Sequence, residues 1–492
     1  MLTRGSRISV YEIWGRLGEG GMSEVWLAKH TVLSVPVVIK TLRRAVAEAV
    51  GVSGAQRMFN EARLMARVTD PRVVRALDAG VTEDVPYLVQ EYVDGIDLAE
   101  LNRERRRALG VGLPLWLVCQ VMMETCQGLH AAHQAGVIHR DVKPSNLFVA
   151  PETGVRLGDF GIAVARADGP CDEVSGTLKF MAPEQLRGGP VDRTTDVYGA
   201  GATAYDLRYG RAPFVETQHI FDPDRDPVFP PPKNPGEAYF QHLLRSMMAT
   251  DRRLRPQDLA EPGKHFATLA QALRPVSRDQ LAVIGKASFR LRDVAVIFCV
   301  GDLALQDVDL IVMSANYEMR MRSGCGESLR VAGGDGIEEE AMRGGERALG
   351  TCVVTGGGKL KARRVVHAVS AWSETSCVGR SMFRALLLAD QLGARSVAVP
   401  ALGTGAARVS METCANAMMT ALRLHVSLGG TRLRSLVVVL SSEEALKTYA
   451  DVAEEALSER DEAPRVSDLG LPADEFEFSE DGSTQLDTAA PS

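Results

Sequence analysis

The chain has 492 residues, more than one hydrophobic core accommodates, which suggests two or three domains. Hydrophobic residues make up 45% and charged residues 24%, a globular composition, and the net charge of −7 argues against general binding to nucleic acid. In the segment 457–492, ten acidic residues stand against two arginines, a charge of −8, so the rest of the chain carries about +1. We expect this segment to be an acidic, disordered tail.

The eight cysteines form no CxxC pair, and most stand inside apolar segments. This pattern favours buried thiols in a reducing compartment over a disulfide framework or a zinc site. No stretch reaches about 18 uncharged apolar residues, and the first residues contain no continuous apolar run. We therefore expect no membrane span and no secretory signal, and a cytoplasmic location.

The first half divides into a β-rich part and a helical part. Residues 11–93 contain short strand-like runs broken by one helical stretch at 55–68. Residues 97–270 favour helices and loops, with a Pro-rich loop at 222–236. Residues 273–287 are expected to connect this half to the next.

The second half alternates apolar strands with helices. Six strand-like runs lie between 294 and 440, and the helical stretches between them are 335–349, 379–392 and 409–427. This pattern predicts a layered α/β domain with a buried sheet.

Residues in the first half have the types and order that phosphoryl transfer requires. The segment LGEGGMSEV places Gly18, Gly20 and Gly21 between apolar flanks, where a backbone without side chains can fold over phosphates. Lys40 ends the apolar run PVVIK and would direct a cation at those phosphates, held by an ion pair with Glu61.

Two further motifs supply the catalytic groups. In HRDVKPSN, Asp141 would orient the substrate hydroxyl, Lys143 would neutralise the transferring phosphoryl group and Asn146 would ligate magnesium. In DFG, Asp159 would bridge magnesium to the phosphates, and APE at 182–184 closes the segment.

With these motifs in this order, residues 11–272 resemble a bacterial eukaryotic-type (Hanks-type) Ser/Thr protein kinase, which implies a bilobal α+β fold. The resemblance implies ATP with Mg²⁺ as cofactor, Mn²⁺ being an alternative, and protein substrates as partners. It implies Gln90 as gatekeeper and assigns Asp196 and Arg255 to structural positions. The ATP-binding residues that it implies are Leu17, Gly18, Gly20, Gly21, Val25, Lys40, Glu61, Glu91 and Val93.

The activation segment departs from the usual pattern. Between Asp159 and Glu184 the hydroxyl side chains are Ser175 and Thr177, and Thr177 stands where the family shapes the substrate site. Arg140 could pair with a phosphate on Ser175, or the acids at 172–173 could supply the charge without modification.

A nearby histidine pair could bind a metal or have a structural role. His130 and His133 form an HxxH pair without an evident third ligand, so we favour a structural role.

The second half contains two glycine-rich loops that each follow a strand and precede a helix. Such loops present backbone N–H groups and a positive helix end to an anion. One is SGCGESL, containing Gly324 and Gly326, and the other is PALGTGAA, containing Gly403, Thr404 and Gly405. Two such loops could hold a diphosphate from two sides, although similar turns also simply connect strands to helices.

Together with Asp302 and Asn316 at strand ends, these loops make residues 288–446 resemble a macro domain, a three-layer α/β/α module with a mixed sheet. The resemblance implies ADP-ribose binding, with Asp302 at the adenine and Asn316 at the distal ribose. Arg320 and Arg322 replace small residues, Glu327 is the one candidate acid, and alanines stand where an aromatic often follows Gly405. These departures favour a ligand reader over a hydrolase.

The sequence thus predicts a multidomain chain: a Ser/Thr kinase followed by a macro domain that binds ADP-ribose, a related nucleotide or an ADP-ribosylated protein. One alternative is a pseudokinase-like scaffold joined to a ligand-reading module. Another is a kinase fused to a hydrolase of ADP-ribosyl groups.

Overall fold

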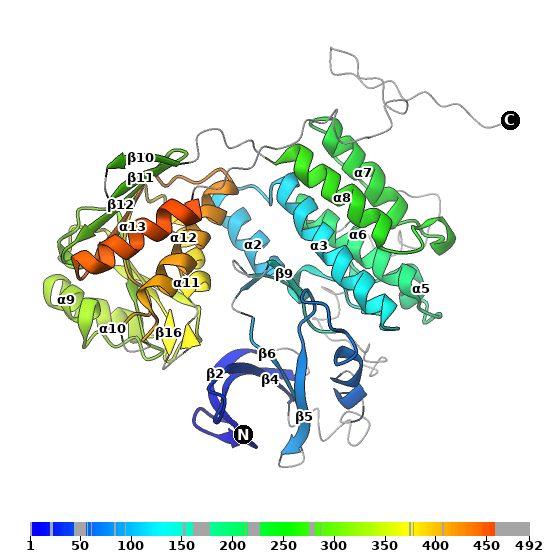
Figure 1. Cartoon of the computed structure of the whole chain (residues 1–492), viewed down its shortest axis with the longest axis horizontal. Helices are drawn as coiled ribbons and strands as arrows, with labels where there is room; N and C mark the ends of the chain where they lie inside the picture. Colours follow the sequence, from blue (N-terminus) through cyan, green and yellow to red (C-terminus); the bar gives the residue numbers. More distant parts are fainter. Residues whose placement is uncertain are drawn as a thin grey trace.

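The computed structural model describes most of the chain between residues 2 and 457, and the predicted tail at 458–492 lies outside it. The described residues are 2–19, 23–43, 56, 58–60, 62–82, 85–93, 95–150, 154–160, 178–211, 213–214, 227–274, 281–285, 287–372, 375–376, 378–405 and 408–457. They form a small β lobe, a helical lobe and a second α/β half that lies beside both lobes (Figure 1).

The first lobe is a six-stranded antiparallel sheet in the order β1-β2-β3-β4-β6-β5. Its strands are β1 (Arg7–Ile8), β2 (Tyr11–Glu19), β3 (Ser23–His30), β4 (Pro36–Leu42), β5 (Ala76–Thr82) and β6 (Val85–Glu91). In β4, Val37 and Ile39 are buried in a core on one face of the sheet. Because side chains alternate along a strand, Lys40 points to the opposite face. The described residues between 56 and 65 are helical, as predicted.

The second lobe is mainly helical, with a small three-stranded sheet next to the first lobe (Figure 1). Its strands are β7 (Ile96–Asp97), β8 (Leu147–Ala150) and β9 (Gly154–Leu157). Its helices are α2 (Leu98–Leu109), α3 (Leu115–Gln134), α5 (Pro183–Leu186), α6 (Arg193–Tyr209), α7 (Pro235–Met247) and α8 (Ala260–Leu273), with short 3₁₀ turns η1 (Pro144–Asn146) and η3 (Arg252–Leu254).

The predicted loop at 222–236 extends too far, because α7 already begins at Pro235. The side chain of Asn234 accepts from Glu237 N and caps the helix, and proline is well suited to a first helical position.

The second half contains an eight-stranded mixed sheet in the order β10-β11-β12-β19-β18-β13-β15-β14. Its strands are β10 (Leu281–Gly285), β11 (Ser288–Leu291), β12 (Val294–Val300), β13 (Leu310–Ser314), β14 (Cys352–Gly356), β15 (Arg364–Ala368), β18 (Ser396–Pro400) and β19 (Ser435–Leu440), and a separate two-stranded ribbon joins β16 (Ala371–Trp372) to β17 (Thr375–Ser376).

Helices cover both faces of this sheet, which confirms the predicted α/β/α layering (Figure 1). On one side lie α11 (Val378–Gln391), α12 (Met411–Ser427) and α13 (Glu443–Leu457). On the other lie α9 (Gly324–Gly333) and α10 (Gly336–Met342), with the short turn η4 (Leu303–Leu305) beside α9.

Three local predictions differ from the structure. Strand β10 lies within 273–287, the expected connector, and pairs with β11, so this apolar run extends the sheet. Helix α10 ends at Met342 instead of 349, since Gly345 adopts a φ of 71°, a left-handed conformation that stops a helix. Helix α13 continues to Leu457, beyond the predicted domain end at 446.

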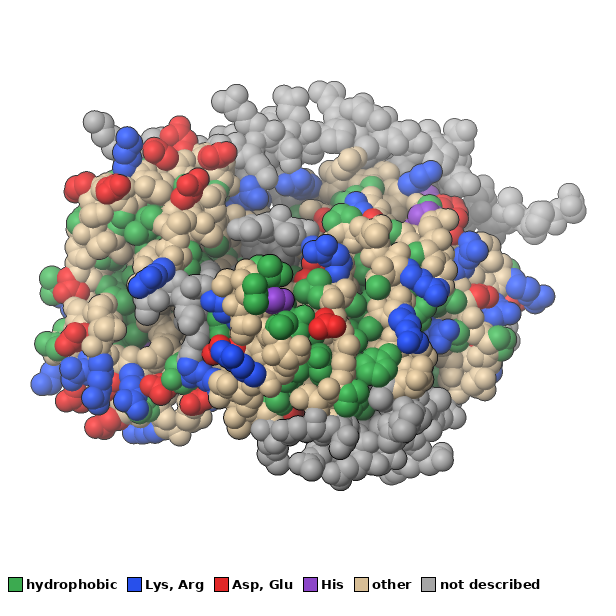
Figure 2. All heavy atoms as spheres, turned by 60° about the horizontal axis from the view of Figure 1, so that its bottom comes forward, with side chains coloured by type: hydrophobic (Ala, Val, Ile, Leu, Met, Phe, Trp, Pro, Cys, Tyr) green, Lys and Arg blue, Asp and Glu red, His purple; other side chains and the backbone are tan. Residues whose placement is uncertain are grey.

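A shared core joins the two halves. One cluster of buried apolar side chains runs from α3 through α2 to α11 and α12. On the face seen in Figure 2, the described basic and acidic side chains are interspersed, so no continuous basic surface forms there. None of the helices in the described part is long and apolar enough to cross a membrane.

Candidate active site and candidate ligand site

The predicted catalytic residues Asp141, Lys143 and Asn146 form one connected group. Lys143 Nζ lies 2.8 Å from Asp141 Oδ2, and Asn146 Nδ2 donates to the same oxygen at 3.1 Å. Asn146 also donates to the Asp141 carbonyl oxygen at 2.8 Å. Because Asn146 Nδ2 makes both of these bonds, its side-chain oxygen Oδ1 points away from Asp141 and is available to bind a metal ion. Asp141 keeps part of its side chain accessible, so its carboxylate can meet a substrate hydroxyl.

A buried carboxylate fixes the loop that carries these residues. Asp196, on α6, accepts from the backbone N–H groups of His139 at 2.8 Å and Arg140 at 2.7 Å. The Nε2 atom of His133 lies 2.7 Å from Asp196 Oδ2, which agrees with a structural role for that histidine. His130 Nε2 lies 3.4 Å from the Gln134 side chain. Among the described residues, no group of three metal-ligating side chains occurs.

Lys40 and Asp159 meet between the two lobes. Lys40 Nζ donates to Asp159 Oδ1 at 3.0 Å. The nearby ammonium group is the main influence that holds the pKa of Asp159 below its usual value, against the opposing effect of burial. The ionised carboxylate and the Asn146 carbonyl are hard oxygen ligands, the donor chemistry that Mg²⁺ prefers. The expected ion-pair partner Glu61 lies outside the described residues.

The segment that links the lobes carries the predicted adenine contacts. Strand β6 ends at Glu91, and Val93 follows two residues later. The Glu91 side chain accepts from Arg75 N at 2.9 Å and pairs with Arg156 of β9 in the helical lobe. Gln90, the predicted gatekeeper, is buried with its amide 3.4 Å from Met65 Sδ.

The predicted phosphate-covering turn is described only at its ends. Gly18 pairs with Val25 across β2 and β3, and a Cβ atom at Gly18 would meet nothing within 4 Å. Leu17 packs against an apolar cluster that extends into the second half. Gly20 and Gly21 lie outside the described residues, as do Ser175 and Thr177 of the activation segment.

Arg140 and Arg255 flank the activation segment. Arg140 adopts a φ of 68°, and among the described residues its buried Nε has no hydrogen-bond partner. The guanidinium of Arg255 is buried and donates to both carboxylate oxygens of Glu184, at 2.9 and 3.0 Å. Although burial favours the neutral acid, this bidentate pair holds the pKa of Glu184 below its usual value.

In the second half, the predicted ligand residues follow the carboxyl ends of parallel strands. Asp302 follows β12, Asn316 follows β13 and Gly403 follows β18. Strand β19 pairs in parallel with both β12 and β18, and β18 pairs in parallel with β13. Carboxyl ends of parallel strands meet at one edge of a sheet, where open α/β sheets bind their ligands.

Hydrogen bonds join these loops. Ser328 Oγ of α9 donates to the Asp302 carboxylate at 2.7 and 2.8 Å. Gly403 N donates to Ser314 Oγ, at the end of β13, at 3.4 Å. Asn316 Oδ1 accepts from Arg320 N at 3.1 Å, and Thr404 Oγ1 donates to Ala401 O at 3.0 Å.

The glycines of the two loops differ in the space around them. Ser323 at the start of α9 makes no capping bond through its side chain, so the first N–H groups of the helix are uncapped by it. Extra atoms at Gly324 or Gly405 would meet nothing within 4 Å, which leaves room for a ligand beside the backbone. At Gly326 a Cβ atom would lie 3.1 Å from Met313 Cε, so this glycine serves close packing.

The arginines near the first loop bind acids. Arg320 Nε lies 3.0 Å from Glu318, and Arg322 Nε lies 3.8 Å from Glu338. Both arginine side chains are largely exposed. Glu327 stands exposed in the first turn of α9.

One contact between the two halves was not predicted from the sequence. Arg380, in the first turn of α11, donates to backbone carbonyls of the segment that links the kinase-like lobes. The signal in the sequence is the pair Arg380 and Arg384, about one turn apart on a largely apolar helix.

Comparison with known proteins assigns families to both halves. The family model described as Protein kinase domain matches residues 11–265, and the one described as Macro domain matches residues 312–418. The chain is 35% identical over 268 residues to the serine/threonine-protein kinase PknB of Mycobacterium tuberculosis, covering 51% of this chain and 41% of that protein. It is 36% identical over 241 residues to PknB of Mycolicibacterium smegmatis, covering 45% of this chain and 36% of that protein.

Among solved structures, the chain is similar to a crystal structure of the Mycobacterium tuberculosis PknI kinase domain. The identity is 27%, the TM-score is 0.44, and the match covers 55% of this chain and all of that one. The chain spans about two fifths or less of the length of the curated relatives described above.

Proposed function

Because the chain belongs to the protein kinase family, we propose that it is a Ser/Thr protein kinase that transfers the γ-phosphoryl group of ATP to protein hydroxyls. The observation that carries the proposal is the group built on Asp141, whose carboxylate holds both Lys143 and Asn146. When bound, Mg²⁺ would neutralise phosphate charge, and Asn146 and Asp159 would hold it. Asp141 would orient the hydroxyl, and Lys40 and Lys143 would face the phosphates.

The test is transfer of radiolabelled phosphate from ATP to casein by the full chain. In Asp141→Asn the amide cannot accept the hydroxyl proton, so we expect the rate to fall by about 10²- to 10⁴-fold. Asp293→Asn changes an exposed aspartate of the second half and should leave the rate unchanged. Equal rates in wild type and Asp141→Asn would contradict the proposal and favour the scaffold alternative.

Regulation and location are further parts of the proposal. We propose that Arg140 receives a phosphate on Ser175, that Thr177 shapes the substrate site and that the kinase domain spans 11–272. The buried Nε of Arg140, which has no partner among the described residues, supports the first of these. Six described cysteines are free thiols, which supports a reducing, cytoplasmic environment.

We also propose that the macro domain binds ADP-ribose or a related nucleotide. The support is one sheet edge that carries Asp302, Asn316 and two loops with open space at Gly324 and Gly405. Backbone N–H groups at α9 suit a diphosphate, and an amide and a carboxylate suit ribose and adenine.

Calorimetry of the full chain with ADP-ribose tests this second proposal. We expect saturable binding that weakens about tenfold in Asn316→Ala, because the exposed amide would lose its contact with the ligand. Asp141→Asn is the control, since it lies in the other site and should bind ADP-ribose as wild type does. Absence of heat from wild type, or equal affinity in Asn316→Ala, would count against the assigned site.

A further inference from the structure

The segment between the two kinase lobes is held from outside by the macro domain. Strand β6 ends at Glu91 and β7 begins at Ile96, so residues 92–95 join the β lobe to the helical lobe. Arg380 of α11 donates from Nη2 to Val93 O at 3.0 Å and from Nε to Gly95 O at 2.6 Å. Its guanidinium also stands 5.6 Å from the ring centroid of Tyr92. One macro-domain side chain therefore contacts three residues of this linking segment.

The same segment is fixed from the kinase side. Gly95 N donates to Val93 O at 3.0 Å, and Glu91 pairs with Arg156 of the helical lobe. With Arg380 bound as well, the peptide planes around Val93 are restrained on both sides. The Val93 carbonyl accepts from two donors, so the orientation of the neighbouring backbone groups depends on Arg380.

Further hydrogen bonds join the macro domain to α2 of the helical lobe. Arg384 binds both carboxylate oxygens of Glu100 on α2, and Gln391 Nε2 donates to Glu104 at 3.1 Å. In the opposite direction, Arg105 of α2 donates to Leu428 O at 2.6 Å and to Gly429 O at 2.8 Å. Arg105 is buried, and this burial lowers its pKa to about 10.

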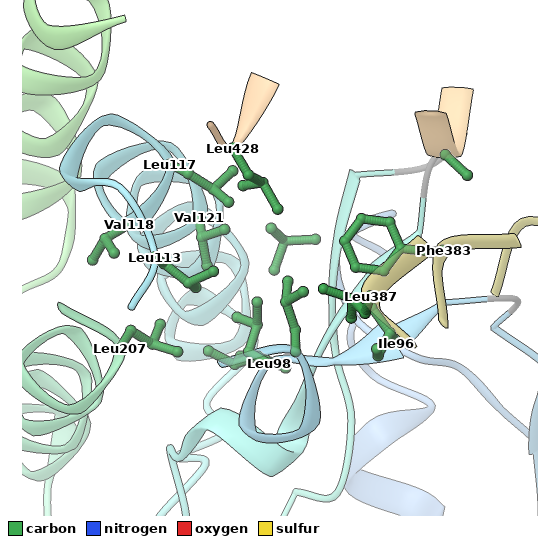
Figure 3. Packing of buried hydrophobic residues seen from close by; sticks show 14 of the residues in the cluster. Ile96, Leu98, Leu113, Leu117, Val118, Val121, Leu207, Phe383, Leu387 and Leu428 are labelled. Carbon is green, nitrogen blue, oxygen red and sulfur yellow. The ribbon is translucent and has the colours of Figure 1, made fainter. Parts of the chain in front are cut away.

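Apolar packing between the halves adds to these hydrogen bonds. In Figure 3, Leu428, Phe383 and Leu387 of the macro half lie with side chains of α2 and α3. On the β lobe, Trp14 and Leu27 are buried in one cluster with Met319 and Met321 of the macro half. A junction that resembles a domain core holds two parts in one orientation.

From these contacts we propose that Arg380 is a positioning residue of the ATP site: the macro domain sets the backbone geometry of Tyr92, Val93 and Gly95 and thereby the affinity for ATP. The inference rests on the proposed kinase activity, in which Glu91 and Val93 meet the adenine. Because the hydrogen bonds fall on the linking segment and not on Asp141 or Lys143, loss of Arg380 should affect ATP binding and not the chemical step.

The test uses full-chain protein, with MgATP varied in casein phosphorylation and the fluorescent analogue mant-ATP in equilibrium binding. In Arg380→Ala we expect KM for ATP and Kd for mant-ATP to rise about tenfold, with kcat within twofold of wild type. Arg384→Ala is the matched control, one turn along α11, because it loses the bonds to Glu100 but leaves Val93 and Gly95 bound to Arg380. It should keep both constants within twofold.

Two results would overturn the proposal. One is a wild-type KM and Kd in Arg380→Ala. The other is an equal rise in Arg380→Ala and Arg384→Ala, which would assign the effect to domain docking alone. If circular dichroism shows Arg380→Ala to be unfolded, Arg380→Lys takes its place. Because one ammonium group cannot span two carbonyls as the guanidinium fork does, KM for ATP and Kd for mant-ATP should rise severalfold in this variant. Values equal to wild type in Arg380→Lys would then overturn it.

The mant-ATP binding measurement tests the role of Arg380 independently of the proposed kinase activity. If wild type phosphorylates no acceptor, the kinase proposal fails, while the comparison of mant-ATP affinity in the variants still tests Arg380. If wild type is active and the affinities do not differ, the positioning role fails and the kinase proposal stands.

Discussion

At the scale of single residues, the catalytic loop is held by bonds that oppose local strain. Arg140 and Asp159 are non-glycine residues with φ values of 68° and 51°. Such conformations cost about 1–3 kcal/mol each and persist where neighbouring bonds over-determine them. For Arg140 the compensating bond is its N–H to Asp196 Oδ1, at 2.7 Å.

Replacing that carboxylate should therefore reduce catalysis as well as stability. In Asp196→Asn the amide keeps the shape but one acceptor becomes a donor, so a buried bond to His133, His139 or Arg140 is lost. We expect a stability loss of about 1–3 kcal/mol and a kcat at least tenfold lower. Thermal denaturation and initial rates measure the two effects. Asp293→Asn, on an exposed aspartate of the second half, should change stability by less than about 0.5 kcal/mol, and a wild-type kcat in Asp196→Asn would refute the positioning argument.

At the scale of elements, strands β14 and β15 enclose a histidine without charge. His367 is buried, and its Nε2 lies 2.9 Å from Thr355 Oγ1 across the strand pair. Burial lowers the pKa of His367 to about 4. In the unfolded chain the side chain titrates near 6.5, so the unfolded state binds the proton first as the pH falls.

The stabilisation from neutral His367 is consequently present above about pH 6.5 and is lost as the pH falls towards 4. We expect His367→Gln, which keeps a polar group for Thr355, to flatten the pH dependence of unfolding between these values. Urea denaturation at a series of pH values provides the measurement. An unchanged slope in His367→Gln would mean that other groups dominate.

The sequence predicted most elements because their signals are local. The strand at Val294–Val300 matches an unbroken apolar run, and Asp141, Lys143 and Asn146 occur within one short motif. The helix end at Met342 was missed because the predicted stretch ran through Gly344 and Gly345, where the helix stops. The bonds from Arg380 to Val93 could not be predicted, since no local pattern records which residues meet across 287 positions of chain.

At the scale of the whole molecule, the two halves share one core instead of meeting through a wet surface. Leu428 is buried and lies near Leu117 and Val121 of α3 (Figure 3). Its carbonyl accepts from Arg105, so apolar and polar contacts coincide at one turn of the macro half. Interfaces between domains are usually more polar than this, and they then allow the domains to move and unfold separately.

The shared core predicts that wild type unfolds in one calorimetric transition. Leu428→Ala should cost about 2–5 kcal/mol and, because it empties the junction, split that transition into two. Leu329→Ala is the matched control: it removes the same atoms from α9, inside the macro half, and should lower a transition that remains single. Differential scanning calorimetry distinguishes the outcomes. Two transitions in wild type, or one lowered transition in both variants, would show that the junction at Leu428 does not couple the halves.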